Sequence, residues 1–252
     1  MNSDIIRTTN HGFKEVTRMA QVYLATDIGP RRELNEDVVA ELGNKTYVVA
    51  DGMGGYAAGE VASRILVDTV KEELAPKNQI DEAALKKAML LANNAILQTV
   101  CDHPKYAGMG TTATIFHQEV KQIVWAHVGD SRLYLLRENS LHQITHDHSL
   151  VSDLVDNGSI TPEEARQHPK RNVITRAVGV TEDLVVDTGA FQIRDGDILM
   201  LSSDGLTSVV SDEDICKMLL NASAEENIAD HLVKAAIAAG SHDNISVIVV
   251  RI

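Results

Sequence analysis

Residues Thr46 to Leu66 read TYVVADGMGGYAAGEVASRIL, an apolar run that meets an aspartate, a glycine-rich turn and then a helical pattern. Such a turn can hold the phosphates of a nucleotide, or it can present the aspartate to a metal ion. The spacing of Gly52, Gly54 and Ala57 matches the G-x-G-x-x-G/A pattern of dinucleotide-binding folds. The rest of the chain decides between these two interpretations.

The segment after the glycine turn disfavours a nucleotide. Apolar residues keep helical spacing from Ala62 to Leu74, and they do so again from Leu85 to Val100, after a cap expected at Asp81. A dinucleotide-binding fold instead needs a strand after its first helix, with an acidic residue at the end of that strand. The metal interpretation is therefore favoured.

Short apolar runs and two further helices make up most of the remaining chain. The charged residues from Ser149 to Lys170 form a small insertion, with a helix start at Thr161-Pro162. We expect helices opened by Ser211 and by Ser223, the second ended by Gly240. Strands are predicted at 22–26, 38–42, 46–50, across a meander at 122–145, and at 185–193, 197–203 and 245–252. Short hairpins with helix pairs between them predict one α+β domain of packed layers.

The composition narrows the class of partner. The chain has 252 residues and a net charge of -13, without a basic block, which argues against nucleic acid and acidic membrane surfaces. Its two cysteines, Cys101 and Cys216, lack the spacing of a zinc site or a disulfide framework. We find neither an export signal nor an apolar run near the roughly 18 residues of a membrane helix. We expect a cytoplasmic protein with a mobile extension over residues 1–20.

Carboxylates recur where apolar strands begin or end. A single Asp-Gly or Asp-Asn is an ordinary turn former, so each instance alone is more often structural. The repetition is harder to explain in that way, because strand ends in a layered fold can meet at one edge. The acidic positions are Asp51, Asp130, Asp204 and Asp243, together with the adjacent pair Glu36 and Asp37.

Carboxylates brought together repel each other unless a cation is present. A site made only of oxygen atoms suits Mg²⁺ or Mn²⁺, whereas zinc would recruit Cys or His. Two such ions can activate a water and stabilise a phosphoryl transfer. Gly52 and Gly54 would let the backbone approach an ion closely. The sequence therefore predicts a metal site that includes Asp51.

Several segments together resemble the metal-dependent serine/threonine protein phosphatases of type 2C, in the bacterial branch of that family. The resemblance implies a four-layer α-β-β-α sandwich, with two central antiparallel sheets flanked by helix pairs and the metal site at one edge. It implies a single catalytic domain over 21–252, with a flap subdomain at 149–171. The matching segments are RELNED (32–37), DGMGG (51–55), GMGTTAT (108–114), HVGDSR (127–132), HDHS (146–149), NVITRAVG (172–179), SSDGL (202–206) and HDNISV (242–247).

The resemblance also implies roles for individual residues. Asp51 would bridge two Mn²⁺ or Mg²⁺ ions, and the carbonyl of Gly52 would bind one of them. Asp204 and Asp243 would hold the other ion. Glu36 and Asp37 would act directly or through water, Asp130 with Asp204 would suit a third ion, and Arg32 would bind the substrate phosphate, which its planar fork suits.

The implied reaction is in-line attack on phosphorus by a metal-bridged hydroxide, on phosphoserine or phosphothreonine, opposing a bacterial serine/threonine kinase. Many relatives have a histidine near the Asp-Gly pair, where this chain has Met53 or Tyr56. Tyr56 could protonate the leaving group, although its reference pKa near ~10 is high for that task, and a metal-bound water is the alternative. We expect a monomer whose partners are phosphorylated proteins.

Two alternatives and one histidine cluster remain open at this level. The chain could be an inactive binding module on the same fold, although none of its four strand-end aspartates is replaced. It could also act on a phosphorylated regulator of a sigma-factor partner switch. The cluster of His142, His146 and His148 suggests zinc, but an exposed strand face is the simpler interpretation, because no cysteine or carboxylate completes a zinc set.

Overall fold

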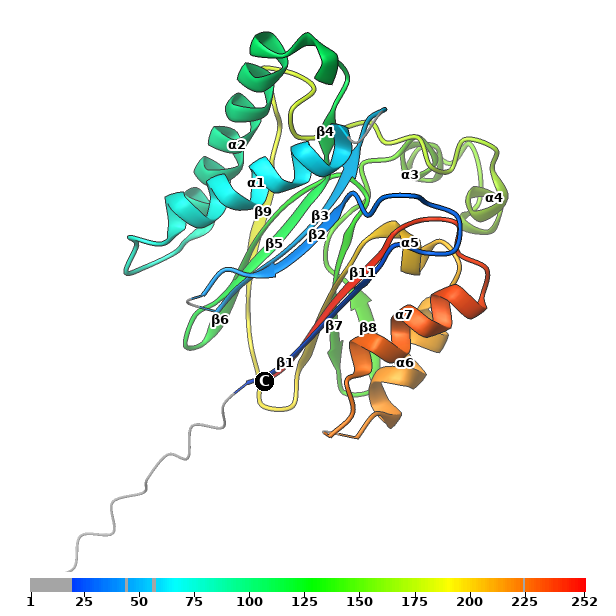
Figure 1. Ribbon diagram of the computed structural model, residues 1–252. Coiled ribbons are helices and arrows are strands. Elements are labelled where there is room, and N and C mark those ends of the chain that lie inside the picture. Colours follow the sequence, from blue (N-terminus) through cyan, green and yellow to red (C-terminus); the bar gives the residue numbers. More distant parts are fainter. Residues whose placement is uncertain (1–19, 44, 56–57, 224) are drawn as a thin grey trace, which may run out of the picture.

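Two antiparallel sheets stacked face to face form the centre of the molecule (Figure 1). The computed structural model describes residues 20–43, 45–55, 58–223 and 225–252. The first sheet has the spatial order β2 (Asp37–Glu41), β3 (Thr46–Met53), β5 (Ala113–Gln118), β6 (Gln122–Val128) and β9 (Asp187–Gln192), with β4 (Gly110–Thr111) beside β3. The second has the order β1 (Gln21–Asp27), β11 (Ile245–Arg251), β10 (Ile198–Ser202), β7 (Arg132–Arg137) and β8 (Ser140–Gln143).

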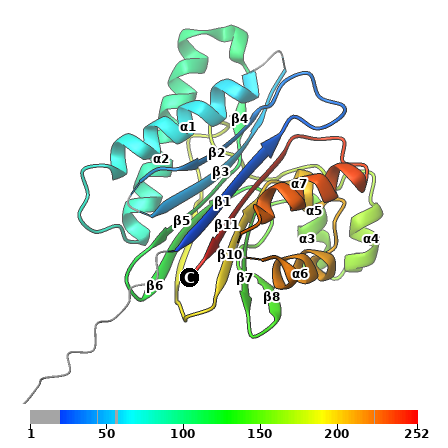
Figure 2. The ribbon, with the colours of Figure 1, turned by 60° about the horizontal axis from the view of Figure 1, so that its bottom comes forward.

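Helix pairs cover the outer faces of the two sheets (Figure 2). The pair on the first sheet is α1 (Ala58–Leu74) and α2 (Glu82–Asp102), which contact β3 and β6. The pair on the second sheet is α6 (Asp212–Asn221) and α7 (Ile228–Ala238), which contact β8 and β11. The short helices η1 (Pro104–Tyr106) and α5 (Asp204–Thr207) complete this part of the chain. The layers follow the predicted α-β-β-α order.

The alternation of side chains along the strands explains why the layers stack. In β3, Tyr47 and Val49 face the second sheet, whereas Val48 and Ala50 face the α1–α2 pair. Both faces of this strand are therefore buried, and its sequence is a continuous apolar run. A third apolar cluster, which includes Val247 of β11, fills the space between the second sheet and α6–α7.

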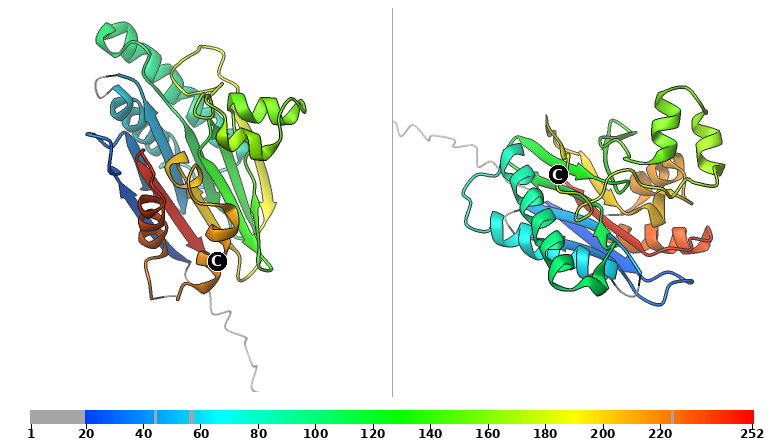
Figure 3. Two further views of the ribbon diagram at one scale, coloured as in Figure 1. Left: turned by 90° about the vertical axis from the view of Figure 1, so that its right-hand side faces the viewer. Right: turned by 90° about the horizontal axis from the view of Figure 1, so that it is seen from above.

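The insertion forms two short helices, α3 (Leu150–Asp156) and α4 (Pro162–Gln167), beside one end of the sheets (Figure 3). Thr161 caps α4 in a reciprocal capping box with Glu164, as the Thr-Pro start predicts. The two ends of the insertion meet, since the backbone N–H of Leu150 donates to the carbonyl of Val173 at 2.8 Å. We call residues 149–171 the flap segment.

Two local predictions were wrong or incomplete. Helix α7 begins at Ile228 with Asn227 as its cap, not at Ser223. The N–H of Ser223 does donate to the Glu226 carboxylate, at 3.2 Å, so the capping signal was used in a turn before the helix. Strand β5 was not predicted, because its six residues include polar ones that are buried, such as His117.

Among the described residues, no helix is long and apolar enough to cross a membrane.

Candidate metal centre

The first two strands of the first sheet bring two carboxylates together. Asp37 opens β2 and Asp51 lies near the end of β3, and the antiparallel register places the two residues directly opposite each other. The backbone around Asp51 is fixed from the neighbouring strand, since its N–H donates to the Thr112 hydroxyl at 3.0 Å and its carbonyl accepts from the Thr112 N–H at 2.8 Å. The carboxylate of Asp37 accepts a hydrogen bond from the Ser203 hydroxyl at 2.9 Å. Both acids are thus held by a rigid frame.

Glu36 and Gly52 lie next to this pair, against the start of α1. The carboxylate of Glu36 accepts the N–H of Gly59, in the first turn of α1, at 3.1 Å, where the helix dipole favours a negative charge. The N–H of Gly52 donates to the Glu36 carbonyl at 3.1 Å. A Cβ on Gly52 would lie 2.2 Å from the Gly59 carbonyl oxygen, so only glycine fits there. The glycine turn therefore packs β3 against both α1 and the Glu36 loop.

Arg32 and Asp243 face each other across the same edge. The guanidinium of Arg32 pairs with the Asp243 carboxylate at 2.8 Å, and both side chains are partly exposed. The next residue, Asn244, holds the loop that carries Arg32. Its side-chain oxygen accepts the N–H of Glu36 at 2.8 Å, and its amide donates to the carbonyls of Ile28 and Leu34 at 2.9 Å each.

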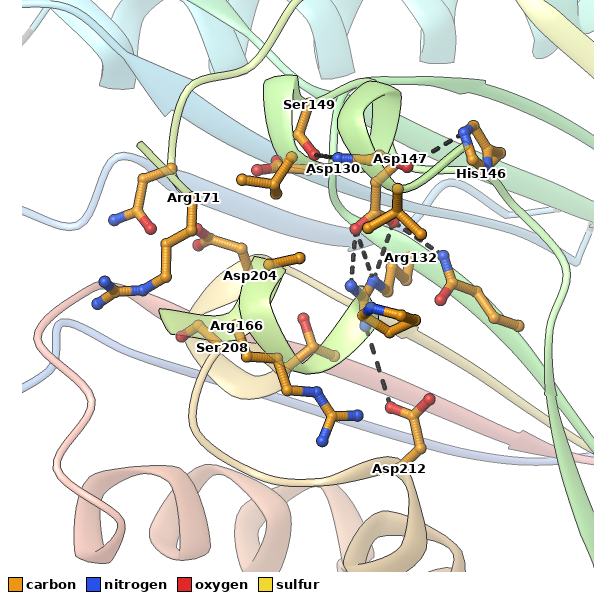
Figure 4. Close-up of a pocket in the computed structure, with 18 of the residues that line it drawn as sticks. Asp130, Arg132, His146, Asp147, Ser149, Arg166, Arg171, Asp204, Ser208 and Asp212 are labelled. Carbon is orange, nitrogen blue, oxygen red and sulfur yellow. Dashed lines mark hydrogen bonds and ion pairs between the residues drawn. The ribbon is translucent and has the colours of Figure 1, made fainter. Parts of the chain in front are cut away.

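A cavity of about 630 Å³ opens beside the remaining two acids (Figure 4). Asp130, in the turn between β6 and β7, and Asp204, at the start of α5, both line it. Arg166 and Arg171 of the flap segment also line this cavity. The cavity therefore joins the flap segment to the acidic edge of the sheets.

Burial, and after it the charges of neighbouring acids, raises the pKa of several carboxyl groups at this edge. Burial, opposed by hydrogen bonds from serines, raises the pKa of Asp37 to about 6. Burial, and then the charge of Asp37, raises the pKa of Asp51 well above its usual range. Burial, and then the charge of Asp130, does the same to the pKa of Asp204, while burial raises the pKa of Asp130 to about 6. The cluster destabilises the folded protein unless a cation neutralises its charge.

The chemistry of these residues fits divalent cations that prefer oxygen ligands. One carboxylate oxygen of Asp37 and one of Asp204 are buried without a hydrogen-bond partner, which leaves them free to bind an ion. Within the described part of the chain, no three His, Cys, Asp or Glu side chains lie close enough together to hold a metal ion by themselves. The acids lie instead along one edge of the sheets, and such a set suits Mg²⁺ because this ion keeps several waters and takes only one or two protein carboxylates.

The structure thus places every predicted site residue that it describes at one edge of the sandwich. The residues found there are Arg32, Glu36, Asp37, Asp51, Gly52, Asp130, Asp204 and Asp243. Tyr56 lies outside the described residues. Sequence reasoning missed Asn244 and Ser203, although both stood inside the quoted segments HDNISV and SSDGL.

Comparison with known proteins agrees with this geometry. The family model for protein phosphatase 2C matches residues 31–235. The protein phosphatase PhpP of Streptococcus pneumoniae is 36% identical over 239 residues, which cover 91% of this chain and 96% of PhpP. The serine/threonine phosphatase Stp1 from Staphylococcus aureus superposes with a TM-score of 0.88 at 36% identity, over 93% of this chain and 96% of Stp1.

A further solved structure contains metal. The catalytic domain of the serine threonine protein phosphatase PstP in complex with 2 manganese ions superposes with a TM-score of 0.85 at 37% identity, over 92% of this chain and 97% of that domain. This chain belongs to the protein phosphatase 2C family. It is a protein phosphatase, a hydrolase, and the predicted family and fold are confirmed.

Proposed function

We propose that the protein hydrolyses phosphoserine and phosphothreonine in cytoplasmic proteins at a centre of two Mn²⁺ or Mg²⁺ ions. The observation that carries this proposal is the pair of Asp37 and Asp51, which lie directly opposite each other on adjacent strands, with a buried, unpartnered oxygen on Asp37. The relatives named serine/threonine phosphatases, and the manganese ions in PstP, support the same conclusion. A serine/threonine kinase of the same cell would supply the substrates, and the phosphatase would act as a monomer.

We assign the acidic residues and the Gly52 carbonyl to two ions and to a third metal site. Asp51 would contribute to both ions of the pair, the carbonyl of Gly52 would hold one of them, and Asp204 and Asp243 would hold the other. Glu36 and Asp37 would act directly or through water. Asp130 and Asp204, which both line the cavity, would hold a third ion. Bound ions of this kind supply Lewis acidity and lower the pKa of a coordinated water.

Arg32 is the group we assign to binding the substrate phosphate. Its side chain keeps 46% of its surface exposed while it pairs with Asp243. A guanidinium on an exposed loop can exchange one carboxylate for a phosphate, because both offer two oxygens to its planar fork. Arg32 would thereby orient the phosphoryl group toward the acidic edge of the sheets.

Tyr56 is the proposed general acid for the leaving alkoxide. We expect Tyr56→Phe to lower turnover of a phosphothreonine peptide more than turnover of an aryl phosphate, because an aryl leaving group needs less help from a proton donor. Steady-state rates on the two substrates measure the difference. Equal losses on both would remove this role from Tyr56.

The function is tested with a phosphothreonine peptide and p-nitrophenyl phosphate, each with Mn²⁺, with Mg²⁺ and with EDTA. We expect turnover that requires metal and that is lost in Asp204→Asn. If the folded wild-type protein releases no phosphate with either metal, the proposal is wrong, and a binding module on the same fold becomes the better account.

A further inference from the structure

The histidine cluster at the start of the flap segment is not the exposed strand face that the sequence suggests. Of the three histidines, only His142 lies in β8. His146 keeps 56% of its side-chain surface exposed, but the side chain of His148 keeps only 3%. The interpretation of an exposed face is therefore wrong for His148, whose buried ring must have polar partners.

The ring of His148 is tied to the turn that carries Asp130. Its Nδ1 accepts the backbone N–H of Gly129 at 3.0 Å, and the backbone N–H of His148 donates to the Gly129 carbonyl at 2.7 Å. Gly129 has a φ of +113°, and a Cβ there would lie 2.6 Å from the side chain of Thr112. The residue before Asp130 is thus held from both sides.

These contacts fix the tautomer of the ring. A backbone N–H can only donate, so Nδ1 of His148 must carry a lone pair and the proton must sit on Nε2. Nε2 then donates to the carboxylate of Asp187, at 3.1 Å. Arg176 lies 3.1 Å from the other oxygen of Asp187 and 3.2 Å from Nε2 of His148. Because Nε2 carries the proton, Arg176 donates to the carboxylate and not to the ring. A ring protonated on both nitrogens could not accept the N–H of Gly129.

The flap segment is anchored at the same point. Residue 148 directly precedes Ser149, which caps α3, and the backbone carbonyl of His148 accepts the N–H of Thr175 at 2.8 Å. One residue earlier, Asp147 pairs at 2.7 Å with the half-buried Arg132, which follows Asp130 by two positions. Both stems of the flap segment are therefore joined to the turn that holds Asp130.

We infer that His148 is a positioning residue that sets the Gly129–Asp130 turn, and with it the place of the Asp130 carboxylate in the cavity. The inference rests on the proposed assignment of Asp130 to a third metal site. His148 touches neither substrate nor ion in this account. It acts through the N–H of Gly129, in the way that partners of ligands orient metal sites.

Two substitutions of His148 test the roles of Nδ1 and Nε2 separately. In His148→Asn, the side-chain oxygen takes the place of Nδ1 and keeps an acceptor for the Gly129 N–H. In His148→Gln, the amide nitrogen takes the place of Nε2 and keeps the donor to Asp187, but the acceptor near Gly129 is lost. His142→Gln, on the exposed part of β8, is the matched control.

The experiment is a calorimetric titration of each folded protein with Mn²⁺. The variant Asp130→Asn is titrated in the same way, and the binding event that it loses identifies the Asp130-dependent site. We expect His148→Gln to weaken this site about 10–100-fold, the usual cost of losing a partner of a ligand, and to leave the other sites unchanged. His148→Asn should stay within about threefold of wild type, as should His142→Gln. Amide hydrogen exchange in the metal-free protein should be faster at Gly129 in His148→Gln than in His148→Asn.

Wild-type binding in His148→Gln, or equal losses in His148→Asn and His148→Gln, would overturn the inference and leave the proposed function standing. Should Asp130→Asn lose no Mn²⁺ site, the assignment of Asp130 fails and the inference fails with it. If His148→Gln does not fold, Asp187→Ala decides, because Asp187 is 38% exposed and can be removed without opening the core. Without this carboxylate, Arg176, which lies 3.2 Å from Nε2, can donate to Nε2 and leave the ring proton on Nδ1, where it opposes the N–H of Gly129. The Asn side chain of His148→Asn has no such tautomer. We expect a weaker Asp130-dependent site in Asp187→Ala also, and unchanged binding would refute the role of the ring.

Discussion

Asp37 and Asp51 lie directly opposite each other on adjacent antiparallel strands. Like charges in such a cross-strand pair destabilise a sheet, and burial makes the cost larger. The pair is retained here beside Asp204 and Asp130, whose pKa values are raised as well. The metal-free fold therefore carries a local electrostatic cost that bound cations would remove.

This cost predicts how metal-free stability depends on pH. Burial raises the folded-state pKa of Asp37 to about 6, from an ordinary value of 3.8. The folded state then holds a proton that the unfolded state releases, so the contribution is full below pH 3.8 and is lost as pH rises through about 6. At pH 7 in EDTA, we expect Asp51→Asn to unfold at a higher temperature than wild type, because one of the two opposed charges is gone.

Thermal unfolding at pH 5 and pH 7, with and without Mn²⁺, measures this effect. Mn²⁺ should raise the unfolding temperature of the wild type more than that of Asp51→Asn. A change of 1 kcal/mol corresponds to roughly 2–4 °C in a chain of this size. A lower unfolding temperature for metal-free Asp51→Asn at pH 7 would show that the pair is not repulsive.

His127 predicts an opposite dependence on pH. Burial, and then the nearby His148, lowers the folded-state pKa of His127 to about 4, from 6.5. A neutral buried imidazole contributes stability above pH 6.5, and that contribution is lost as pH falls toward 4. Between pH 7 and pH 5 the wild type should therefore lose about 2 kcal/mol through this residue.

The comparison with His127→Gln isolates this contribution, because all other titrating groups are shared. Denaturant unfolding at the two pH values should show that the advantage of the wild type over the variant shrinks at pH 5. A constant difference between the two proteins would mean that burial does not lower the pKa of His127 in the folded state.

Gly52→Ala tests whether the glycine turn is a packing requirement. Its Cβ would meet the carbonyl oxygens of Gly59 and Glu36 at 2.2 and 2.5 Å, and backbone atoms cannot rotate away. We expect a loss of about 1–3 kcal/mol or more in the free energy of unfolding, as for other overpacked sites. Gly55→Ala is the control, since a Cβ there meets nothing within 4 Å and should change stability by less than about 0.5 kcal/mol. Similar values for both variants would argue against this account.

The flap segment predicts a change in substrate choice. Residues 151–172 can be replaced by a short Gly-Ser linker, because Leu150 and Val173 are already joined by a 2.8 Å hydrogen bond. We expect aryl phosphate hydrolysis to be spared, while the relative rates on different phosphoproteins change, because Arg166 and Arg171 of the segment line the cavity and would contact only substrates that extend beyond the phosphate group. Loss of both activities together would contradict a role in substrate selection.

The sequence predicted much of the fold because local patterns agree with it. The cap at Asp81, the start of α4 at Thr161 and the apolar run of β3 each follow from neighbouring residues alone. The pairing of β1 with β11 does not, since more than 200 positions separate Gln21 from Arg251 in the chain. Local periodicity carries no information about such distant partners.

The candidate site shows the same division. The repetition of aspartates at strand ends predicted which carboxylates lie together. It did not predict the pairing of Arg32 with Asp243, the three hydrogen bonds of Asn244 or the burial of His148. Each of these depends on contacts between loops that are far apart in sequence. Gly52, expected to give an ion access to the backbone, also fills a space too small for any side chain.

The most direct test of the central claim is the rate of phosphate release from a phosphothreonine peptide as Mn²⁺ is raised, in wild type, Asp51→Asn and Asp195→Asn. Asp195 is an exposed acid of the turn before β10 and serves as the matched control. If Asp51 is a ligand of the metal ions, turnover should rise with Mn²⁺ in the wild type and in Asp195→Asn. Turnover in Asp51→Asn should be at least 100-fold lower than in the wild type, roughly the scale for losing a group that stabilises the transition state. Wild-type turnover in a folded Asp51→Asn protein would contradict the account.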